Sequence, residues 1–296
     1  MNKTAAIGLA AIMVWGLTAC GGTDGDTNTD NPATPAPTSS APASEEPSES
    51  AATEFSGKLA IEGSTSTQKI FQELIDTYTA KNPKVEIEYT GNGSGAGIKA
   101  AIEDTTNIGT SSRAIKDEEK SQGLEVYQFA EEAIAVIVNP ANTVKELTKG
   151  QIAKIYKKEI TNWKDPGGTD ATIVVAARDA ASGTREAFET IFDVKDRVKA
   201  DQEAASTGEV KTVVAQNPNA IGYISLAYSD DTVKNLVIDG MVASTDNVKN
   251  GSYTIKRPFN MVTKGKPDKL EQVFIDYVFS DEGAEIIAKE AVPVSK

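Results

Sequence analysis

The segment TIVVAARDAASGTREAF, residues 172–188, decides the fold class of this chain. Residues 172–179 form a short apolar run typical of a buried strand, and an apolar helical pattern begins directly behind Ser182, Gly183 and Thr184. A strand that passes through a glycine-hydroxyl turn into a helix is the repeating unit of an α/β fold. Because Arg178 and two hydroxyls surround this helix entrance, the segment also predicts a socket for a small anion.

Two other segments share this layout. GSTSTQ (63–68) follows a candidate strand at 58–64, and GNGSGAG (91–97) follows one at 85–91. The first N–H groups of a helix have no partner within it, and they carry the positive end of the helix dipole. Glycine allows a ligand to approach the backbone, and Ser or Thr adds a hydroxyl donor. We therefore expect three helix entrances and Arg178 to face one point and hold an oxyanion.

The remaining pattern alternates between strands and helices, which favours an α/β fold with covered sheets. Further strands are predicted at 107–112, 131–140, 220–228 and 253–265. Helices are predicted within 70–78, 98–102, 151–163 and 267–287, the last with a break near 280–283.

The first twenty residues predict a secretory signal peptide. A short basic start precedes an apolar run and the small-residue ending LTAC (17–20), which resembles the lipobox of bacterial lipoproteins. That resemblance implies a lipid on Cys20, the single cysteine of the chain. Residues 21–54 are rich in Thr, Ser, Pro, Ala and acids and hold almost no apolar bulk, so they are expected to form a disordered tether.

Composition excludes several kinds of chemistry. The chain has no histidine and one cysteine, which removes the usual zinc sites and the Ser-His-Asp triad. We expect no metal and no cofactor. Residues 55–296 hold 29 Lys and Arg against 36 Asp and Glu, and this acidic balance disfavours nucleic acid as a partner.

With these motifs identified, residues 55–296 resemble the phosphate-binding lipoproteins that serve bacterial ABC phosphate importers. The resemblance lies in GSTST, GNGSGAG, IGTSSRAI (108–115), LTKGQIAKIYKKEITNW (147–163) and, most specifically, RDAASGTREAF (178–188). It implies a type II periplasmic-binding-protein fold of two non-contiguous α/β lobes joined by a two-strand hinge. The first lobe would comprise 55–138 and 254–296, and the second 139–253.

The resemblance also implies a site in the cleft between the lobes, with no catalytic residue. The positions that match the family's phosphate-binding motifs are Thr65, Ser66, Ser94, Ser112, Arg178, Ser182, Gly183 and Thr184, with Ser64 and Arg113 as further candidates. Many family members carry an aspartate where this chain has Ser112. That carboxylate accepts the proton of hydrogen phosphate and rejects sulfate, so Ser112 weakens the inference of phosphate over sulfate.

The sequence therefore predicts an exported, non-enzymatic and monomeric receptor on the outer face of the cell membrane. It would be anchored through Cys20, bind inorganic phosphate and deliver it to an ABC permease. Four alternatives stay open at this point. They are a receptor for sulfate or molybdate, a secreted hydrolase with Ser66 and Lys69 of STQK (66–69), a surface adhesin or regulator, and a dinucleotide site at GNGSGA (91–96).

Overall fold

Strands and helices alternate along residues 55–296, the part of the chain that the computed structural model describes. The predicted signal peptide, Cys20 and the tether at 21–54 lie outside the described residues. No helix within residues 55–296 is both long and apolar enough to pass through a bilayer.

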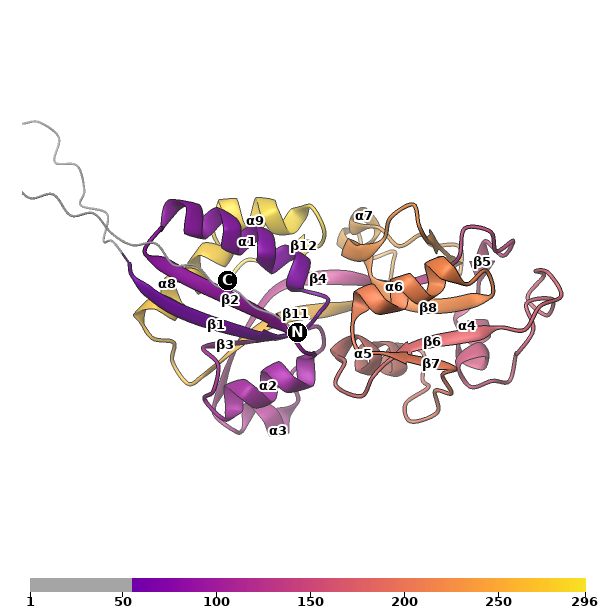
Figure 1. Cartoon of the computed structure of the whole chain (residues 1–296), viewed down its shortest axis with the longest axis horizontal. Helices are drawn as coiled ribbons and strands as arrows, with labels where there is room; N and C mark the ends of the chain where they lie inside the picture. The colour runs from indigo at the N-terminus through magenta and orange to yellow at the C-terminus, as the bar shows by residue number, and fades with distance from the viewer. Residues whose placement is uncertain (1–54) are drawn as a thin grey trace, which may run out of the picture. The chain divides into compact units, whose positions relative to one another are not determined.

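The first lobe, drawn on the left of Figure 1, begins with three parallel strands in the order β2-β1-β3. Their bounds are β1 (Gly57–Gly63), β2 (Val85–Gly91) and β3 (Ile108–Ser111). The helices of this lobe are α1 (Gln68–Lys81), α2 (Ser94–Ile102), α3 (Asp117–Lys120), α8 (Lys269–Val278) and α9 (Asp281–Ala288). The ends of β1 and β2 lead directly into α1 and α2, so two helix entrances lie at neighbouring strand ends.

The second lobe, on the right of Figure 1, contains a parallel trio in the order β8-β6-β7. Its strands are β6 (Val174–Arg178), β7 (Gln202–Ala204) and β8 (Ala220–Ser225). Its helices are α4 (Lys149–Tyr156), α5 (Gly183–Ile191), α6 (Thr207–Gln216) and α7 (Thr245–Lys249). The ends of β6 and β7 lead into α5 and α6, which repeats the arrangement of the first lobe.

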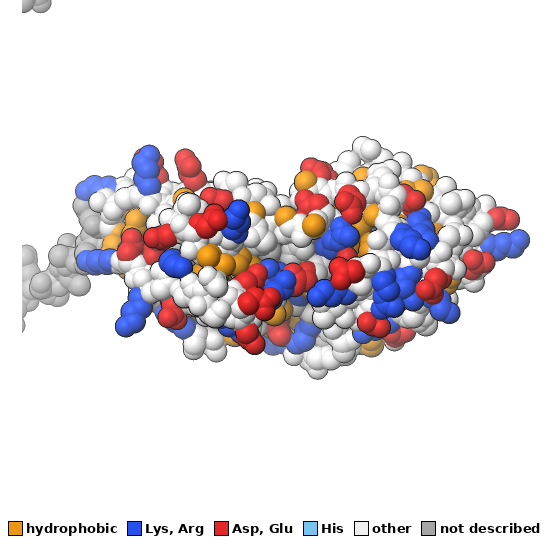
Figure 2. Space-filling model, turned by 90° about the horizontal axis from the view of Figure 1, so that it is seen from below, with side chains coloured by type: hydrophobic (Ala, Val, Ile, Leu, Met, Phe, Trp, Pro, Cys, Tyr) orange, Lys and Arg blue, Asp and Glu red, His pale blue; other side chains and the backbone are white. Residues whose placement is uncertain are grey.

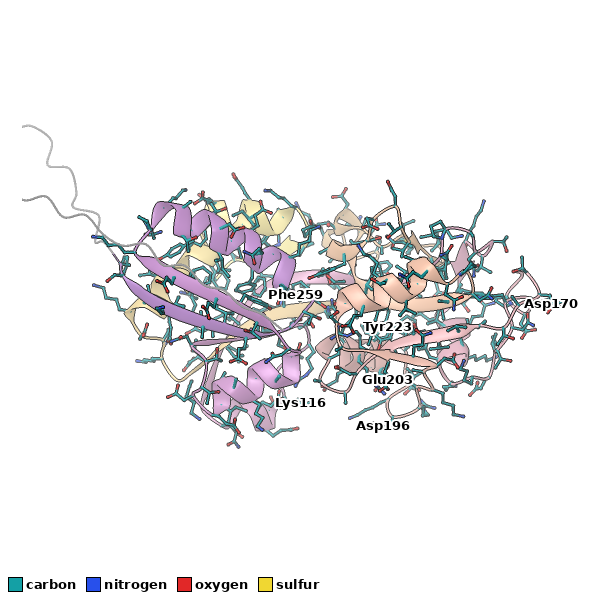
Figure 3. The ribbon with its side chains drawn as sticks, viewed as in Figure 1. Lys116, Asp170, Asp196, Glu203, Tyr223 and Phe259 are labelled. Carbon is teal, nitrogen blue, oxygen red and sulfur yellow. The ribbon has the colours of Figure 1, made fainter. Side chains whose placement is uncertain are left out.

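Two long antiparallel strands connect the lobes. They are β4 (Leu124–Val138) and β11 (Lys256–Lys264), whose register shifts between Phe259 and Asn260. Arg257 of β11 lies opposite Glu132 of β4. Figure 3 labels Phe259 near the middle of the described structure and Tyr223 of β8 in the second lobe. Both connections are therefore neighbouring strands of one sheet.

Short elements complete the described structure. They are β5 (Glu146–Leu147), the 3₁₀ turn η1 (Leu226–Tyr228), β9 (Lys234–Asn235), β10 (Val237–Ile238) and β12 (Val292–Pro293). β9 and β12 pair with β4, and β10 pairs with β5.

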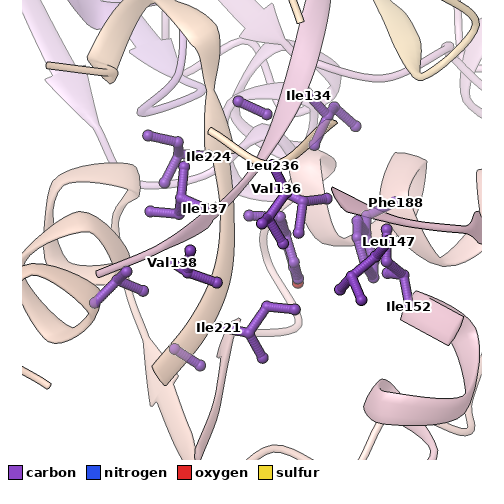
Figure 4. Packing of buried hydrophobic residues seen from close by; sticks show 14 of the residues in the cluster. Ile134, Val136, Ile137, Val138, Leu147, Ile152, Phe188, Ile221, Ile224 and Leu236 are labelled. Carbon is purple, nitrogen blue, oxygen red and sulfur yellow. The ribbon is translucent and has the colours of Figure 1, made fainter. Parts of the chain in front are cut away.

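Each lobe has its own hydrophobic core. The buried apolar residues of the first lobe's main core run from Leu59 to Ala130 and from Phe259 to Ala291. Those of the second run from Ala133 to Ile255. Figure 4 shows Ile137 of β4 beside Ile224 of β8, with Ile134 and Val136 on the other side of β4. The continuous apolar run at the end of β4 is explained by this burial, since a strand covered on both faces needs no polar alternation.

Most predicted elements are present, and two of the strands differ clearly in extent. β4 begins at Leu124, seven residues before the predicted run, because its first half alternates with charged and polar residues and gives a weaker signal. The predicted strand 220–228 ends at Ser225 and continues as η1. The break predicted near 280–283 is confirmed, because α8 ends at Val278 and α9 begins at Asp281, and the Ser280 side chain caps α9 by accepting from Gly283 N–H.

Candidate functional site

The loop between β1 and α1 is held by its own side chains. The Ser64 hydroxyl accepts from Ser66 N–H at 3.1 Å, while the Ser64 carbonyl accepts from the Thr67 hydroxyl at 3.0 Å and from Tyr89 at 2.6 Å. These bonds fix the turn and leave the hydroxyls of Thr65 and Ser66 directed toward the second lobe.

Six buried hydroxyls from both lobes form a connected group, which we call the hydroxyl cluster. Its members are Thr65, Ser66, Ser94, Ser112, Thr184 and Thr207, each 4% exposed or less. Ser66 Oγ lies 2.8 Å from Thr184 Oγ1 and 3.1 Å from Thr207 Oγ1. Ser112 Oγ lies 3.4 Å from Thr184 Oγ1 and 3.2 Å from Ser94 Oγ. The cluster thus joins the two lobes through groups that can each donate and accept a hydrogen bond.

The beginnings of four helices meet at this cluster. Ser94 and Thr207 are the first residues of α2 and α6, Thr184 is the second residue of α5, and Ser66 lies two residues before α1. The amides in the first turn of a helix lack intrahelical partners, and the dipole of each helix places partial positive charge at its beginning. Four such beginnings around one group of hydroxyls form a local environment that favours an anion despite the acidic composition of the chain.

Glycine permits the close approach of the two lobes. A Cβ on Gly183 would lie 2.3 Å from Ser94 Oγ, and one on Gly93 would lie 2.9 Å from the Ala181 carbonyl. Gly93 has a φ of 103°, a conformation that residues with side chains rarely adopt. The amide of Gly95 donates to the Ala181 carbonyl at 3.0 Å, which adds a main-chain bond between the lobes.

Arg178 places a buried positive charge beside the cluster. It lies at the end of β6, is 1% exposed, and its Nη1 donates to Thr207 Oγ1 at 3.3 Å. Its Nε and Nη2 donate to the carbonyls of Ala204 and Ala205, which hold the guanidinium in place. Burial lowers the pKa of Arg178. Among residues 55–296 no acidic side chain forms an ion pair with it, so its charge is available to an anionic ligand.

Three predicted residues do not bring their side-chain donors to the cluster. The Ser64 hydroxyl fixes its own loop, and the Ser182 hydroxyl caps α5 by accepting from Arg185 N–H at 3.2 Å. Arg113 follows Ser112, but its guanidinium contacts Glu119 and Glu186. Gly183 has no side chain, and its amide is the first of α5. These residues shape the entrances around the cluster.

The sequence prediction omits Thr207. Its hydroxyl contacts Thr65 Oγ1, Ser66 Oγ and Arg178, which makes it the most connected member of the cluster. The signal was available, since SerThrGly at 206–208 repeats the hydroxyl-glycine entrance of the other motifs. The preceding strand β7 has only three residues, too few to show a periodic pattern.

Lys69 is not arranged as a catalytic partner of Ser66. Its Nζ donates to the Ala227 carbonyl at 2.8 Å and lies 2.7 Å from Glu290, while Ser66 Oγ bonds to Thr184 and Thr207. A serine nucleophile needs a base within hydrogen-bond reach. The geometry therefore gives no support to the serine-lysine hydrolase. Within residues 55–296 no group of three acidic, Cys or His side chains is placed to hold a metal ion.

Two lobes on a two-strand connection, with a buried polar cluster between them, define a two-lobed binding protein. A family model described as PBP superfamily domain matches residues 36–282. The phosphate-binding protein PstS of Bacillus subtilis is 33% identical over 231 residues, covering 77% of each chain. PstS of Borreliella burgdorferi is 31% identical over 245 residues, covering 78% of this chain and 88% of its own.

Solved structures of similar proteins point to the same family. A Clostridium perfringens protein, described as a substrate-binding protein of a phosphate ABC transporter and solved with bound phosphate, matches with a TM-score of 0.79 and 41% identity. The match covers 81% of this chain and all of that one. An ABC-type phosphate transport receptor from Vibrio cholerae matches with a TM-score of 0.67 and 31% identity over 80% of this chain and all of its own. The chain therefore belongs to the PBP superfamily and, within it, to the family of the phosphate-binding proteins PstS.

Proposed function

We propose that this chain is a receptor that binds inorganic phosphate between its lobes and delivers it to an ABC transporter. The observation that carries the proposal is the meeting of four helix beginnings, six hydroxyls and the unpaired guanidinium of Arg178. The names of the relatives support it, because they describe phosphate-binding proteins and phosphate transport receptors. The family is one of binding proteins, and the proposal includes no catalytic step.

The binding residues that we propose are the members of the hydroxyl cluster, Arg178 and the first-turn amides of α5, including that of Gly183. Each hydrogen bond to a charged group contributes about 1.5–3 kcal/mol. Micromolar affinity needs about 8 kcal/mol, so a few of these donors together with Arg178 are sufficient. Arg178 adds a planar fork that matches two oxygens of one tetrahedral anion.

A receptor for another tetrahedral oxyanion is the second candidate. It is favoured because Ser112 has hydroxyl neighbours in the cluster and stands where many family members carry an aspartate. The hydrogen bonds described for the cluster hydroxyls join them to one another, to main-chain N–H groups and to Arg178. A hydroxyl can accept a hydrogen bond from the O–H of hydrogen phosphate, and it can also donate one to sulfate. We therefore expect measurable sulfate binding that is weaker than phosphate binding.

Calorimetry on the full-length chain tests both candidates. We expect heat of binding with phosphate, weaker heat with sulfate, and loss of both in Arg178→Ala. Arg197→Ala is the matched control, because Arg197 is half exposed and pairs with Asp193 outside the cluster. A wild-type chain that binds neither phosphate nor sulfate nor molybdate would remove the receptor function.

We propose that the lobes separate and close about β4 and β11. Along the chain, the buried apolar residues pass from the first lobe's core to the second between Ala130 and Ala133, and they return to the first between Ile255 and Phe259. We therefore propose crossings at Glu131–Glu132 and at Lys256–Pro258. The first lies six to seven residues before the boundary at 138 that is expected from the sequence, because residues 133–138 pack in the second core. Closing buries the cluster and presents one shape of the receptor to the transporter.

We also propose that the receptor acts as an exported monomer, held at the outer face of the membrane through a lipid on Cys20. The support is the sequence of residues 1–20 alone, which lie outside the described residues. Mass spectrometry of the mature chain should find a lipid-modified Cys20, and Cys20→Ser should release the protein into the medium. Retention of that variant at the membrane would refute the anchor. Light scattering tests the oligomeric state and should give the mass of a monomer.

A further inference from the structure

Charged side chains from both lobes meet beside the hydroxyl cluster. Arg113 follows the cluster residue Ser112, and Glu186 lies two residues after Thr184 in the first turn of α5. Arg113 Nε lies 2.8 Å from Glu186 Oε2, and Lys116 Nζ lies 2.9 Å from Glu186 Oε1. The same two segments therefore supply the contact between Ser112 and Thr184 in the cluster and the ion pair between Arg113 and Glu186.

Arg113 is held in position from within the first lobe. Its Nη1 and Nη2 donate to the two carboxylate oxygens of Glu119 at 2.8 and 2.7 Å, and its side chain is 7% exposed. Burial opposes its charge, but the hydrogen bonds to Glu119 and the nearby charge of Glu186 raise the pKa of Arg113. A bidentate pair fixes the guanidinium plane, so Nε is presented to the second lobe without a further loss of side-chain entropy.

The surroundings of these ion pairs depend on both lobes. A cavity of about 260 Å³ adjoins them, and its lining comes from 113–116 of the first lobe, from 186, 187, 190 and 191 of the second, and from 256–258 of the crossing strand β11. Figure 3 labels Lys116 at the side of the first lobe nearest the second, and Figure 2 shows acidic and basic side chains interleaved where the lobes meet. Separation of the lobes would break both bonds of Glu186 and leave the Arg113–Glu119 pair intact.

We propose that Glu186 is a latch residue, whose pairing with Arg113 and Lys116 holds the closed state and sets the rate at which phosphate leaves. This rests on the proposed function. A contact that exists only in the closed state stabilises that state and is absent when phosphate first meets the open lobes. Its loss therefore accelerates release and leaves association almost unchanged. Glu186 is a positioning residue, because it acts through the lobes and does not touch the cluster.

Glu186→Gln tests the proposal, because it keeps the shape of the side chain and removes its charge. Glu189→Gln is the matched control, since Glu189 lies on the same helix and pairs with Arg185 of the same lobe. Release of radiolabelled phosphate from the full-length protein into excess unlabelled phosphate gives the dissociation rate. Because two partly exposed pairs are lost, we expect about five-fold faster release in Glu186→Gln. Association should be almost unchanged, and Glu189→Gln should resemble wild type.

Lys116→Met removes one of the two pairs from the other lobe and should accelerate release by less. Unchanged release in Glu186→Gln would overturn the latch, and so would equal acceleration in Glu189→Gln. A failure of the proposed function would look different, because the wild type itself would then retain no phosphate. In that case small-angle X-ray scattering still decides: the latch predicts a larger radius of gyration for Glu186→Gln than for wild type, and equal radii refute it.

Discussion

Ser66 and Thr184 are 118 residues apart in the chain, yet their hydroxyl oxygens lie 2.8 Å apart. One belongs to the loop before α1 in the first lobe, and the other to the first turn of α5 in the second. The contact exists only because β4 and β11 bring the two lobes together. A ligand held here therefore responds to the geometry of the whole described structure, and the following predictions test that dependence.

Thr207→Val should weaken phosphate binding by about ten-fold or more, because a hydrogen bond to a charged group is lost without a change in size. Thr207→Ser should restore most of the affinity. Thr212→Val is the control, because Thr212 is an exposed residue of the same helix whose hydroxyl donates to the Gly208 carbonyl. Calorimetry measures all three, and wild-type affinity in Thr207→Val would exclude Thr207 from the site.

Gly183→Ala should prevent full closing, since its Cβ would lie 2.3 Å from Ser94 Oγ and 2.7 Å from Ser94 Cβ. We expect phosphate affinity to fall by at least about ten-fold, because only a minor population remains competent to bind. Gly150→Ala is the control, since the nearest atom to its Cβ would lie at 3.9 Å. Tight binding by Gly183→Ala would show that the site does not need this close approach.

Two buried tyrosines of the second lobe should respond in opposite ways to loss of the hydroxyl. The Tyr156 hydroxyl has no hydrogen-bond partner within residues 55–296, whereas the Tyr253 hydroxyl donates to the Ile134 carbonyl at 2.8 Å. Tyr156→Phe should leave the free energy of unfolding unchanged or raise it, and Tyr253→Phe should lower it by about 1 kcal/mol. Denaturant unfolding measures both, and a clear loss in Tyr156→Phe would contradict the prediction.

Glu119 should make stability depend on pH in the acid range. Burial acts to raise its pKa, but the hydrogen bonds from Arg113 and from Lys116 N–H outweigh it, so the pKa is lowered from 4.5. Its contribution is thus complete above pH 4.5 and is lost as the pH falls through the lowered value. Glu119→Gln should show a shallower loss of unfolding temperature below that pH than wild type.

The exposed neighbour Glu118 supplies the control for this titration. Glu118→Gln removes a carboxylate from the same helix and leaves the two hydrogen bonds between Arg113 and Glu119 in place. An identical acid dependence in wild type and Glu119→Gln would mean that the Arg113–Glu119 pair does not contribute to folding.

The parts of the site that the sequence predicts are those encoded in short segments. A strand, a glycine-hydroxyl turn and a helix are adjacent in the chain, so Ser66, Ser94 and Thr184 could be placed at helix entrances from the sequence alone. The carboxyl ends of parallel strands lie at one edge of the sheet, where ligands bind in α/β folds. The helix entrances that follow these strands are therefore expected to meet there. The geometry of the cluster agrees with that expectation, while the binding role of each residue stays a prediction.

The parts that the sequence does not predict depend on contacts between distant segments. The pairing of Arg113 with Glu186 has no local signal, because it exists only when two lobes approach. The position of Arg113 directly after Ser112 makes it a candidate for phosphate binding, and nothing in the sequence shows that its guanidinium is bonded to Glu119. Thr207 was omitted for a different reason, since the brevity of β7 hides the strand that would have marked its entrance.

The division of the cores has a consequence for how the chain is made. The buried apolar residues of the second lobe all lie between Ala133 and Ile255, whereas the first lobe needs Leu59–Ala130 together with Phe259–Ala291. During synthesis and export the second lobe can thus reach its native packing while the first still awaits its final helices. A nascent chain halted before β11 would hold one finished lobe beside an incomplete one, the form most exposed to proteases and to aggregation.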